Sequence, residues 1–232
     1  EIHERLVGSE MCIRDRSNRA PQRNLMEICA CVSPALVITN RKKPDGYPGL
    51  STAELRTLCA GCPADMPPDV LAIPNLANCS GGTTGKTKVI EQDMPAGESD
   101  EGLRTWFAVS GMRFEMRQLL AGPLFHGAPH SAAFNGLYCG NTLVMPAKLD
   151  AETIVRLIKK YRIEYVQMVP TLMQRISRMP GFRKEDLASL EVLCHTGGVC
   201  SQDLKREWLQ IIPPERLYEM YAMTAVSYTH LR

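Results

Sequence analysis

Short apolar runs alternate with amphipathic helical patterns through the second half of the chain, residues 118–220. The runs are bounded by Pro, Gly or polar turns, which is typical of buried strands. Between two of them, Asp150 is placed to cap a helical pattern whose apolar face carries Ile154 and Ile158. Strands that alternate with helices favour an α/β fold of layered, mixed but largely parallel sheets flanked by helices. The expected strands are 118–123, 142–145, 165–169, 191–194 and 216–220; the expected helices are 131–138, one after Asp150, one from Thr171, and 202–210.

The first half of the chain carries fewer regular patterns. Residues 34–39 form a short β-branched run between a proline and a polar turn, which predicts a buried strand. Ser51 and Glu54 have the spacing of a capping box, so a helix is expected to begin at Thr52. Residues 91–102 are acidic and contain glycine, and we interpret them as a mobile surface segment.

Composition argues against several classes of function. The chain has 232 residues, of which 44% are hydrophobic, enough for a sizeable core. Its 27 basic and 25 acidic side chains leave a net charge of +2, so neither nucleic acid nor an anionic membrane is expected as the main partner. No apolar run approaches the roughly 20 residues that cross a bilayer, and the N-terminus lacks the apolar stretch of a secretory signal. We therefore expect no membrane span and a cytoplasmic location.

The nine cysteines are an odd number without the spacing of a small disulfide framework. In the absence of an export signal, we interpret them as reduced thiols. Cys29 and Cys31, together with Cys59 and Cys62, could supply four zinc ligands. The Cys-x-Cys pair is one residue tighter than the usual knuckle, however, so the spacing favours core or surface thiols over zinc.

The two ends of the chain differ from the rest. Residues 1–16 and 226–232 show no apolar periodicity that would dock them on a core. Both segments resemble translated adapter sequence of the kind found at the ends of assembled gene fragments, and we leave both out of the reasoning about the fold. The expected domain spans residues 17–225.

Residues 80–88, Ser-Gly-Gly-Thr-Thr-Gly-Lys-Thr-Lys, are chemically the most distinctive segment. The glycines allow tight turns whose backbone N–H groups can face phosphate oxygens, while the hydroxyls and lysines add donors and positive charge. A Walker A loop has the Gly-Lys-Thr found at residues 85–87, but it also needs a glycine where Ser80 stands and a helix after the loop. Residues 88–90, Lys-Val-Ile, indicate a strand instead.

The same segment resembles the phosphate loop of the adenylate-forming (AMP-binding) superfamily, which includes acyl-CoA synthetases, luciferases and the adenylation domains of peptide synthetases. Only Thr87 departs from the pattern, at a place where proline is commonest. Four further segments resemble family motifs in the family's order. They are Pro123-Leu-Phe-His126, Val169-Pro-Thr-Leu-Met173, Thr196-Gly-Gly-Val199 and Tyr221-Ala-Met-Thr224. The resemblance extends from about residue 34 to residue 224. It implies part of the large N-terminal domain of a CoA ligase. The resemblance is to ligases for bulky carboxylic acids, a group that includes the ligases for bile acids.

The resemblance also implies roles for individual residues. Thr83, Thr84 and Lys88 would bind the β- and γ-phosphates of ATP. Thr224 would contact the α-phosphate, and Tyr221 would stack beside the adenine. The candidate nucleotide-binding residues are therefore Ser80, Gly81, Gly82, Thr83, Thr84, Gly85, Lys88, Gly197, Gly198, Tyr221 and Thr224, and the candidate catalytic residues are Lys88, His126 and Thr224.

Other positions near these motifs have more than one interpretation. Gly197 and Gly198 would let the backbone lie close to the adenine, because they have no Cβ. His126 would lie at the floor of the acyl site, near the entry of CoA. His195 precedes the glycine turn and could contact the adenine or the acyl group, or it could be structural. Cys194 is expected to be a small apolar filler, because no base is placed to activate it as a nucleophile.

One departure from the family pattern concerns the metal. A glutamate that usually holds Mg²⁺ follows the motif threonine in the family, and Ala225 occupies this position here. The resemblance implies ATP, Mg²⁺, CoA and a small-molecule carboxylic acid as partners. The chain alone is expected to be inactive, because it lacks the family's later ribose-binding and lysine motifs. Two alternatives remain: a P-loop NTPase, which predicts a helix from Gly85, and a non-catalytic nucleotide-binding module, which a genuine Ala225 would favour.

Overall fold

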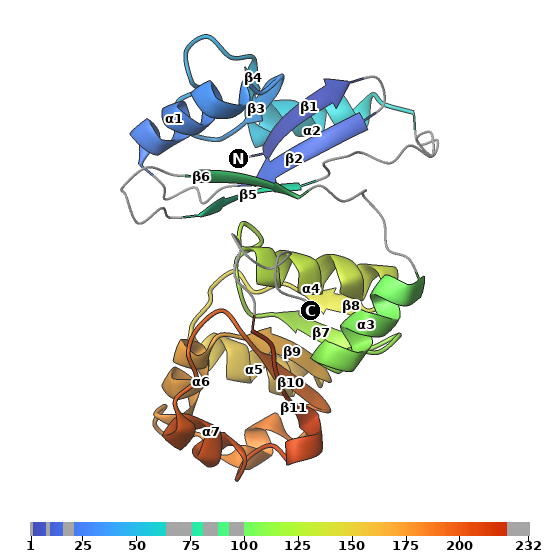
Figure 1. Ribbon diagram of the computed structural model, residues 1–232, viewed down its shortest axis with the longest axis vertical. Coiled ribbons are helices and arrows are strands. Elements are labelled where there is room, and N and C mark those ends of the chain that lie inside the picture. The colour runs from blue at the N-terminus through green and yellow to red at the C-terminus, as the bar shows by residue number, and fades with distance from the viewer. Residues whose placement is uncertain are drawn as a thin grey trace. The chain divides into compact units, whose positions relative to one another are not determined.

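The structure, a computed structural model, describes residues 2–7, 10–15, 21–63, 76–80, 88–92 and 100–221. The chain divides into two compact units, residues 1–97 and residues 98–232, and each is described by itself (Figure 1). Among the described residues, no helix has both the length and the apolar character needed to cross a membrane.

The first unit is built on a mixed six-stranded sheet in the order β4-β3-β1-β2-β5-β6. Its strands are β1 (Ile2–Val7), β2 (Glu10–Asp15), β3 (Leu36–Ile38), β4 (Gly49–Leu50), β5 (Leu76–Ser80) and β6 (Lys88–Gln92), and its helices are α1 (Gln22–Val32) and α2 (Thr52–Ala60). Leu25 and Cys29 of α1 pack on Val37 of β3 to form a small core. At the start of α2, the Ser51 hydroxyl accepts a hydrogen bond from the Glu54 N–H, and the Glu54 carboxylate accepts one from the Ser51 N–H.

The second unit is built on an all-parallel sheet in the order β11-β10-β9-β7-β8. Its strands are β7 (Arg117–Leu120), β8 (Thr142–Val144), β9 (Tyr165–Met168), β10 (Val192–His195) and β11 (Leu217–Glu219). Its α-helices are α3 (Asp100–Ser110), α4 (Gly127–Tyr138), α5 (Ala151–Tyr161), α6 (Pro170–Ser177) and α7 (Gln202–Trp208), and two 3₁₀ turns span Lys184–Leu187 and Pro214–Arg216. Parallel strands joined through helices are the architecture that alternating strand and helix patterns predict.

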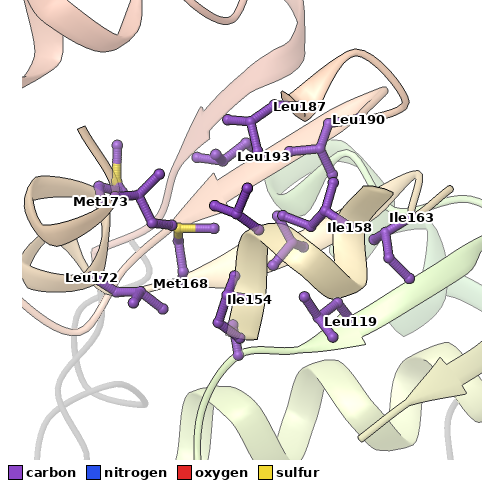
Figure 2. Packing of buried hydrophobic residues seen from close by; sticks show 14 of the residues in the cluster. Leu119, Ile154, Ile158, Ile163, Met168, Leu172, Met173, Leu187, Leu190 and Leu193 are labelled. Carbon is purple, nitrogen blue, oxygen red and sulfur yellow. The ribbon is translucent and has the colours of Figure 1, made fainter. Parts of the chain in front are cut away.

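Two hydrophobic clusters cover the two faces of this sheet. On one face, α5, α6 and α7 pack against alternate strand residues such as Val166, Met168 and Leu193. Figure 2 shows Met168 and Leu193 in this cluster together with Ile154 and Ile158 of α5. On the other face, Tyr165, Val192 and Cys194 pack with side chains of α3 and α4. Both faces of β9 and β10 are therefore buried, which accounts for their mostly apolar sequences.

Most of the elements expected from the sequence are confirmed, with shifts at their ends. Helix α4 begins at Gly127, four residues earlier than expected, and includes Pro129 in its first turn, where proline is tolerated. The interpretation of residues 91–102 as one mobile segment is wrong at both ends, because β6 includes residues 91–92 and α3 begins at Asp100. Helix α1 was not expected from the sequence.

Residues 1–16, which we expected to lie outside the natural sequence, contain β1 and β2. These strands pair with each other, and β1 also pairs with β3. This strand pairing places residues 2–7 and 10–15 in the sheet of the first unit, but it does not test whether they belong to the natural sequence. The origin of residues 1–16 stays a prediction, as does that of residues 226–232, which are outside the described residues.

Candidate functional site

Four chain segments leave the same edge of the parallel sheet in the second unit. In such a sheet the carboxyl ends of the strands meet at one edge. Strands β7, β9, β10 and β11 all end there, and the register places His195 level with both Met168 and Glu219. The segments that follow hold the motif residues of this unit that the structure describes, namely Pro123 to His126, Val169 to Met173, Thr196 to Val199, and Tyr221.

The chain changes direction across the sheet between β7 and β9. From β7 it continues to β8 on one side, whereas from β9 it continues to β10 and β11 on the other. In open α/β sheets, ligands bind outside the carboxyl ends of the strands at such a switch point. His126, in the segment after β7, and Val169, directly after β9, therefore flank the position where a ligand is expected.

A surface hollow of about 620 Å³ lies at the opposite, amino edge of this sheet. Four of its charged residues form two ion pairs: Arg117 lies 2.6 Å from the Glu164 carboxylate, and Arg113 pairs with Glu191. Because ligands bind at the carboxyl edge of such sheets, we assign the candidate site to that edge and not to the hollow.

His126 is the N-cap residue of α4. Its backbone is extended, its N–H donates to the Pro123 carbonyl at 3.1 Å, and its carbonyl accepts from the His130 N–H at 3.1 Å. The His126 ring lies 4.6 Å from the Phe125 ring and is exposed. Local hydrogen bonds thus hold the backbone of His126 at the carboxyl edge, and its side chain is exposed where a ligand can reach it.

The glycine turn after β10 lies against the proline turn after β9. The Thr196 N–H donates to the Met168 carbonyl at 3.2 Å, so that the segment after β10 is hydrogen-bonded to the end of β9. Gly197 has a φ of +76°, a conformation that favours glycine, and a Cβ there would lie 3.3 Å from Cγ1 of Val169. The backbone at Gly197 and Gly198 is exposed, so a flat ring could approach it closely.

His195 is buried directly beneath this turn, with 1% of its surface exposed. Its Nδ1 lies 4.0 Å from Oε1 of Glu219, and its Nε2 is buried without a hydrogen-bond partner among the described residues. Burial lowers the pKa of the imidazole, the nearby Glu219 carboxylate raises it, and Lys205 lowers it. The ring therefore lies under the turn, on the face of the sheet that α7 covers, and not in the open space above it.

Glu219 accepts a hydrogen bond from Lys205 of α7, and this contact lowers the pKa of the carboxyl group. The Met220 N–H donates to the His195 carbonyl at 3.0 Å. Lys205 and Glu219 were not identified from the sequence, because sequence alone does not give the register of β11 beside β10. The sequence did contain one signal for Glu219: it is a charged residue at the end of an expected strand, two residues before the motif residue Tyr221.

Cys194 is buried on the opposite face of β10, and burial raises the pKa of its thiol to about 12. A thiol that holds its proton so firmly is a poor nucleophile, in agreement with its expected role as a filler. No group of three or more metal-ligating side chains was found among the described residues.

The phosphate loop belongs to the first unit. Strands β5 and β6 are antiparallel, and Ser80 at the end of β5 is paired with Lys88 at the start of β6. The loop thus joins two neighbouring strands and is followed by a strand, whereas a Walker loop must open a helix. The P-loop alternative is therefore wrong on this point. Gly81, Gly82, Thr83, Thr84 and Gly85, and likewise Thr224 and Ala225, lie outside the described residues.

Comparison with known proteins finds CoA ligases among the relatives of this chain. The chain is 32% identical over 103 residues to 4-coumarate–CoA ligase 3 of Oryza sativa, an alignment that covers 44% of the chain and 19% of the relative. It is 30% identical over 151 residues to 2-succinylbenzoate–CoA ligase of Bacillus pumilus, with 62% of the chain and 28% of the relative covered. The chain therefore spans less than a third of the length of these two relatives.

Solved structures share the fold at low identity. ATP-bound MatB from Rhodopseudomonas palustris matches 92% of the chain with a TM-score of 0.78 and 18% identity, and the match covers 45% of that structure. The N-terminal domain of FACL13 from Mycobacterium tuberculosis matches 90% of the chain with a TM-score of 0.75 and 20% identity, covering 56% of that structure. The family model described as "AMP-binding enzyme" matches residues 34–230, most of the chain. This chain belongs to the AMP-binding enzyme family.

Proposed function

We propose that the protein that contains this chain is an ATP-dependent carboxylic acid–CoA ligase, and that this chain supplies part of its nucleotide site. The observation that carries the proposal is the convergence of motif segments at one sheet edge: the glycine turn at 196–199, the proline turn at 169–171 and Tyr221 leave adjacent strands, level with each other. That edge is where α/β sheets bind ligands. The printed names of the two relatives, both CoA ligases, agree with this function.

In the proposed reaction, a carboxylate oxygen of the acid attacks the α-phosphorus of ATP. The bond from this phosphorus to the bridging oxygen of pyrophosphate breaks, giving an acyl adenylate and free pyrophosphate. The sulfur of CoA then attacks the acyl carbon, the bond from that carbon to AMP breaks, and the thiol proton goes to solvent. Catalysis of such steps depends mainly on positioning and on stabilisation of charge.

The residues of this chain would act chiefly on the nucleotide. Thr83, Thr84 and Lys88 would bind the β- and γ-phosphates and help pyrophosphate to depart by offsetting its charge. Thr224 would bind the α-phosphate where negative charge develops. Tyr221, whose surface is 90% exposed, has the accessibility needed to stack on an adenine.

The backbone of Gly197 and Gly198 would form the other wall of the adenine site, because it is exposed and carries no Cβ. The exposed imidazole of His126 would face the acyl group on the β7 side of the switch point.

Mg²⁺ stays a prediction from the family resemblance. Ala225 stands at the family's metal-binding position and its side chain offers no oxygen ligand. We therefore assign no step to a metal held by this chain. A cytoplasmic location likewise stays a prediction from the sequence.

The direct test is carboxylate-dependent exchange of pyrophosphate into ATP by the full-length protein. A panel of acids should include 4-coumarate and 2-succinylbenzoate, the acids named by two relatives, together with fatty acids and bile acids. Exchange that requires one class of acid supports the proposal and identifies the substrate. Binding of ATP without exchange for any acid in the panel would favour the non-catalytic nucleotide-binding module instead.

Variants make this test specific to the site. Lys88→Ala and Thr224→Ala should each lower kcat/KM for exchange by about 100-fold, because each removes a donor to charge that develops in the transition state. Thr57→Ala, at an exposed position of α2, is the matched control and should leave exchange unchanged. Equal activity of all three variants would contradict the assignment of the phosphate-binding residues.

A further inference from the structure

One backbone hydrogen bond ties the end of β11 to the end of β10 at His195, and the side chain of Glu219 lies near the imidazole of the same residue. The His195 carbonyl accepts a hydrogen bond from the Met220 N–H at 3.0 Å, and its Nδ1 faces Oε1 of Glu219 at 4.0 Å. Met220 is the residue directly before Tyr221, and Thr196 directly follows His195. The contacts therefore join the two segments that the proposed nucleotide site needs side by side.

A third group completes the cluster from outside the sheet. Lys205 of α7 binds the second oxygen of the Glu219 carboxylate, so this carboxylate lies between an ammonium group and the buried imidazole. Helix α7 is itself fixed to the core, because Leu204 and Trp208 are buried against the sheet. The cluster thus connects the rigid interior to the last residue of an edge strand.

The energetics of the cluster argue for a role other than stability. The side chains of Lys205 and Glu219 are 36% and 48% exposed, and ion pairs of such exposure contribute little to folding. The buried Nε2 of His195 has no hydrogen-bond partner among the described residues, which costs free energy and does not stabilise the fold. What the contacts do fix is the position of the backbone after β11.

We propose that Glu219 is a positioning residue of the nucleotide site, held by Lys205 beside the buried imidazole of His195 so that the segment carrying Tyr221 stays beside the glycine turn at 196–199. The proposal rests on the ligase function proposed above. It predicts that Glu219 affects the binding of ATP more than the chemical step, because the segment it positions carries Tyr221, the residue proposed to stack on the adenine.

The experiment compares KM for ATP and kcat in the exchange assay of the full-length protein. Glu219→Gln and Lys205→Met should each raise KM for ATP about three- to tenfold while kcat stays within about twofold. Glu207→Gln, an exposed residue of the same helix, is the matched control and should behave like the unmodified protein. An unchanged KM for ATP in Glu219→Gln would overturn the proposal.

A charge swap separates the ion pair from a general loss of packing. Lys205→Glu and Glu219→Lys should each raise KM for ATP, and the double variant should recover most of the original value because the pair is restored with its signs reversed. Failure of the double variant to recover would show that the pair is not what positions the segment.

A second measurement does not depend on catalysis. Hydrogen exchange at the Met220 amide should become faster in Glu219→Gln, whereas the amides of β9 should keep their protection. If the unmodified protein shows no exchange of pyrophosphate with any acid, the proposed function fails, and the Met220 amide then decides the structural part of the inference by itself. An unchanged exchange rate at Met220 would overturn that part.

Discussion

At the scale of single residues, a buried polar cluster under α4 shows how closely side chains and backbone are fitted. Gln118 of β7 is 1% exposed; its Nε2 donates to the Ala132 carbonyl at 2.7 Å, and its Oε1 accepts from Asn141 at 3.2 Å. Gly136 of α4 lies directly against this amide, so that a Cβ at position 136 would overlap Oε1. The amide can stay satisfied only while position 136 carries no side chain.

We therefore expect Gly136→Ala to destabilise the second unit, by about 1–3 kcal/mol, because either the helix or the amide must move. Thermal unfolding followed by circular dichroism measures the effect. Gly198→Ala is the control for stability, since the nearest atom to its Cβ would be Cδ of Pro170 at an ordinary 3.8 Å. A Gly136→Ala protein as stable as this control would contradict the packing described here.

The cysteines give a second prediction at this scale. Cys31, Cys59 and Cys62 are exposed, whereas Cys29, Cys139 and Cys194 are buried. Burial raises the pKa of Cys194 to about 12, so near neutral pH almost none of it is the reactive thiolate. Iodoacetamide followed by mass spectrometry should label the three exposed cysteines quickly and the three buried ones only after unfolding. Rapid labelling of Cys194 in the folded protein would count against its place in the core.

At the scale of elements, α5 shows why some helices could be foreseen. Asp150 accepts a hydrogen bond from the Thr153 N–H at 2.8 Å, and the apolar residues of the helix recur on one face. Both features are local in sequence, so the prediction of this helix was confirmed. Helix α3 was not foreseen, although Leu103, Trp106 and Phe107 recur at helical spacing, because its acidic start suggested a surface segment. Trp106 and Phe107 find their partners only in the folded unit.

The cap of α5 makes a testable contribution to stability. Asp150→Ala should lower the Tm by a few degrees because the Thr153 N–H loses its acceptor, whereas Asp150→Asn should keep most of the stability, since asparagine caps equally well. Retention of the full Tm by the alanine variant would show that the cap does not matter.

The cap also has a definite dependence on pH. Hydrogen bonds from Lys148 and from the Thr153 N–H lower the pKa of Asp150 to about 2, below its value of about 3.9 in an unfolded chain. A lowered pKa in the folded state stabilises the fold at higher pH, and this contribution is lost as the pH falls from about 4 towards 2. The Tm difference between the unmodified protein and Asp150→Ala should therefore shrink over that range and stay constant near neutral pH.

At the scale of the whole molecule, the sequence motifs are divided between the two units. The phosphate loop joins β5 and β6 in the first unit, and the glycine turn, His126 and Tyr221 belong to the second. Motifs and their order were visible in the sequence, because the chemistry of phosphate and base contacts limits the residue types. The network of Lys205, Glu219 and His195 was not visible, because it depends on strand register and on the packing of α7.

The division also predicts how the molecule folds. Each of the three hydrophobic clusters found among the described residues draws its side chains from one unit only, and the two larger ones lie in the second unit. A polypeptide of residues 98–221 should therefore unfold in a single cooperative transition, since small domains with their own core generally do.

Gly136→Ala should lower the Tm of this polypeptide about as much as in the full chain, because the contacts of Gln118 all lie within this unit. This polypeptide should bind ATP far more weakly than the full-length protein, since it lacks the phosphate loop. A second unit without a cooperative transition would mean that its core needs the first unit to form.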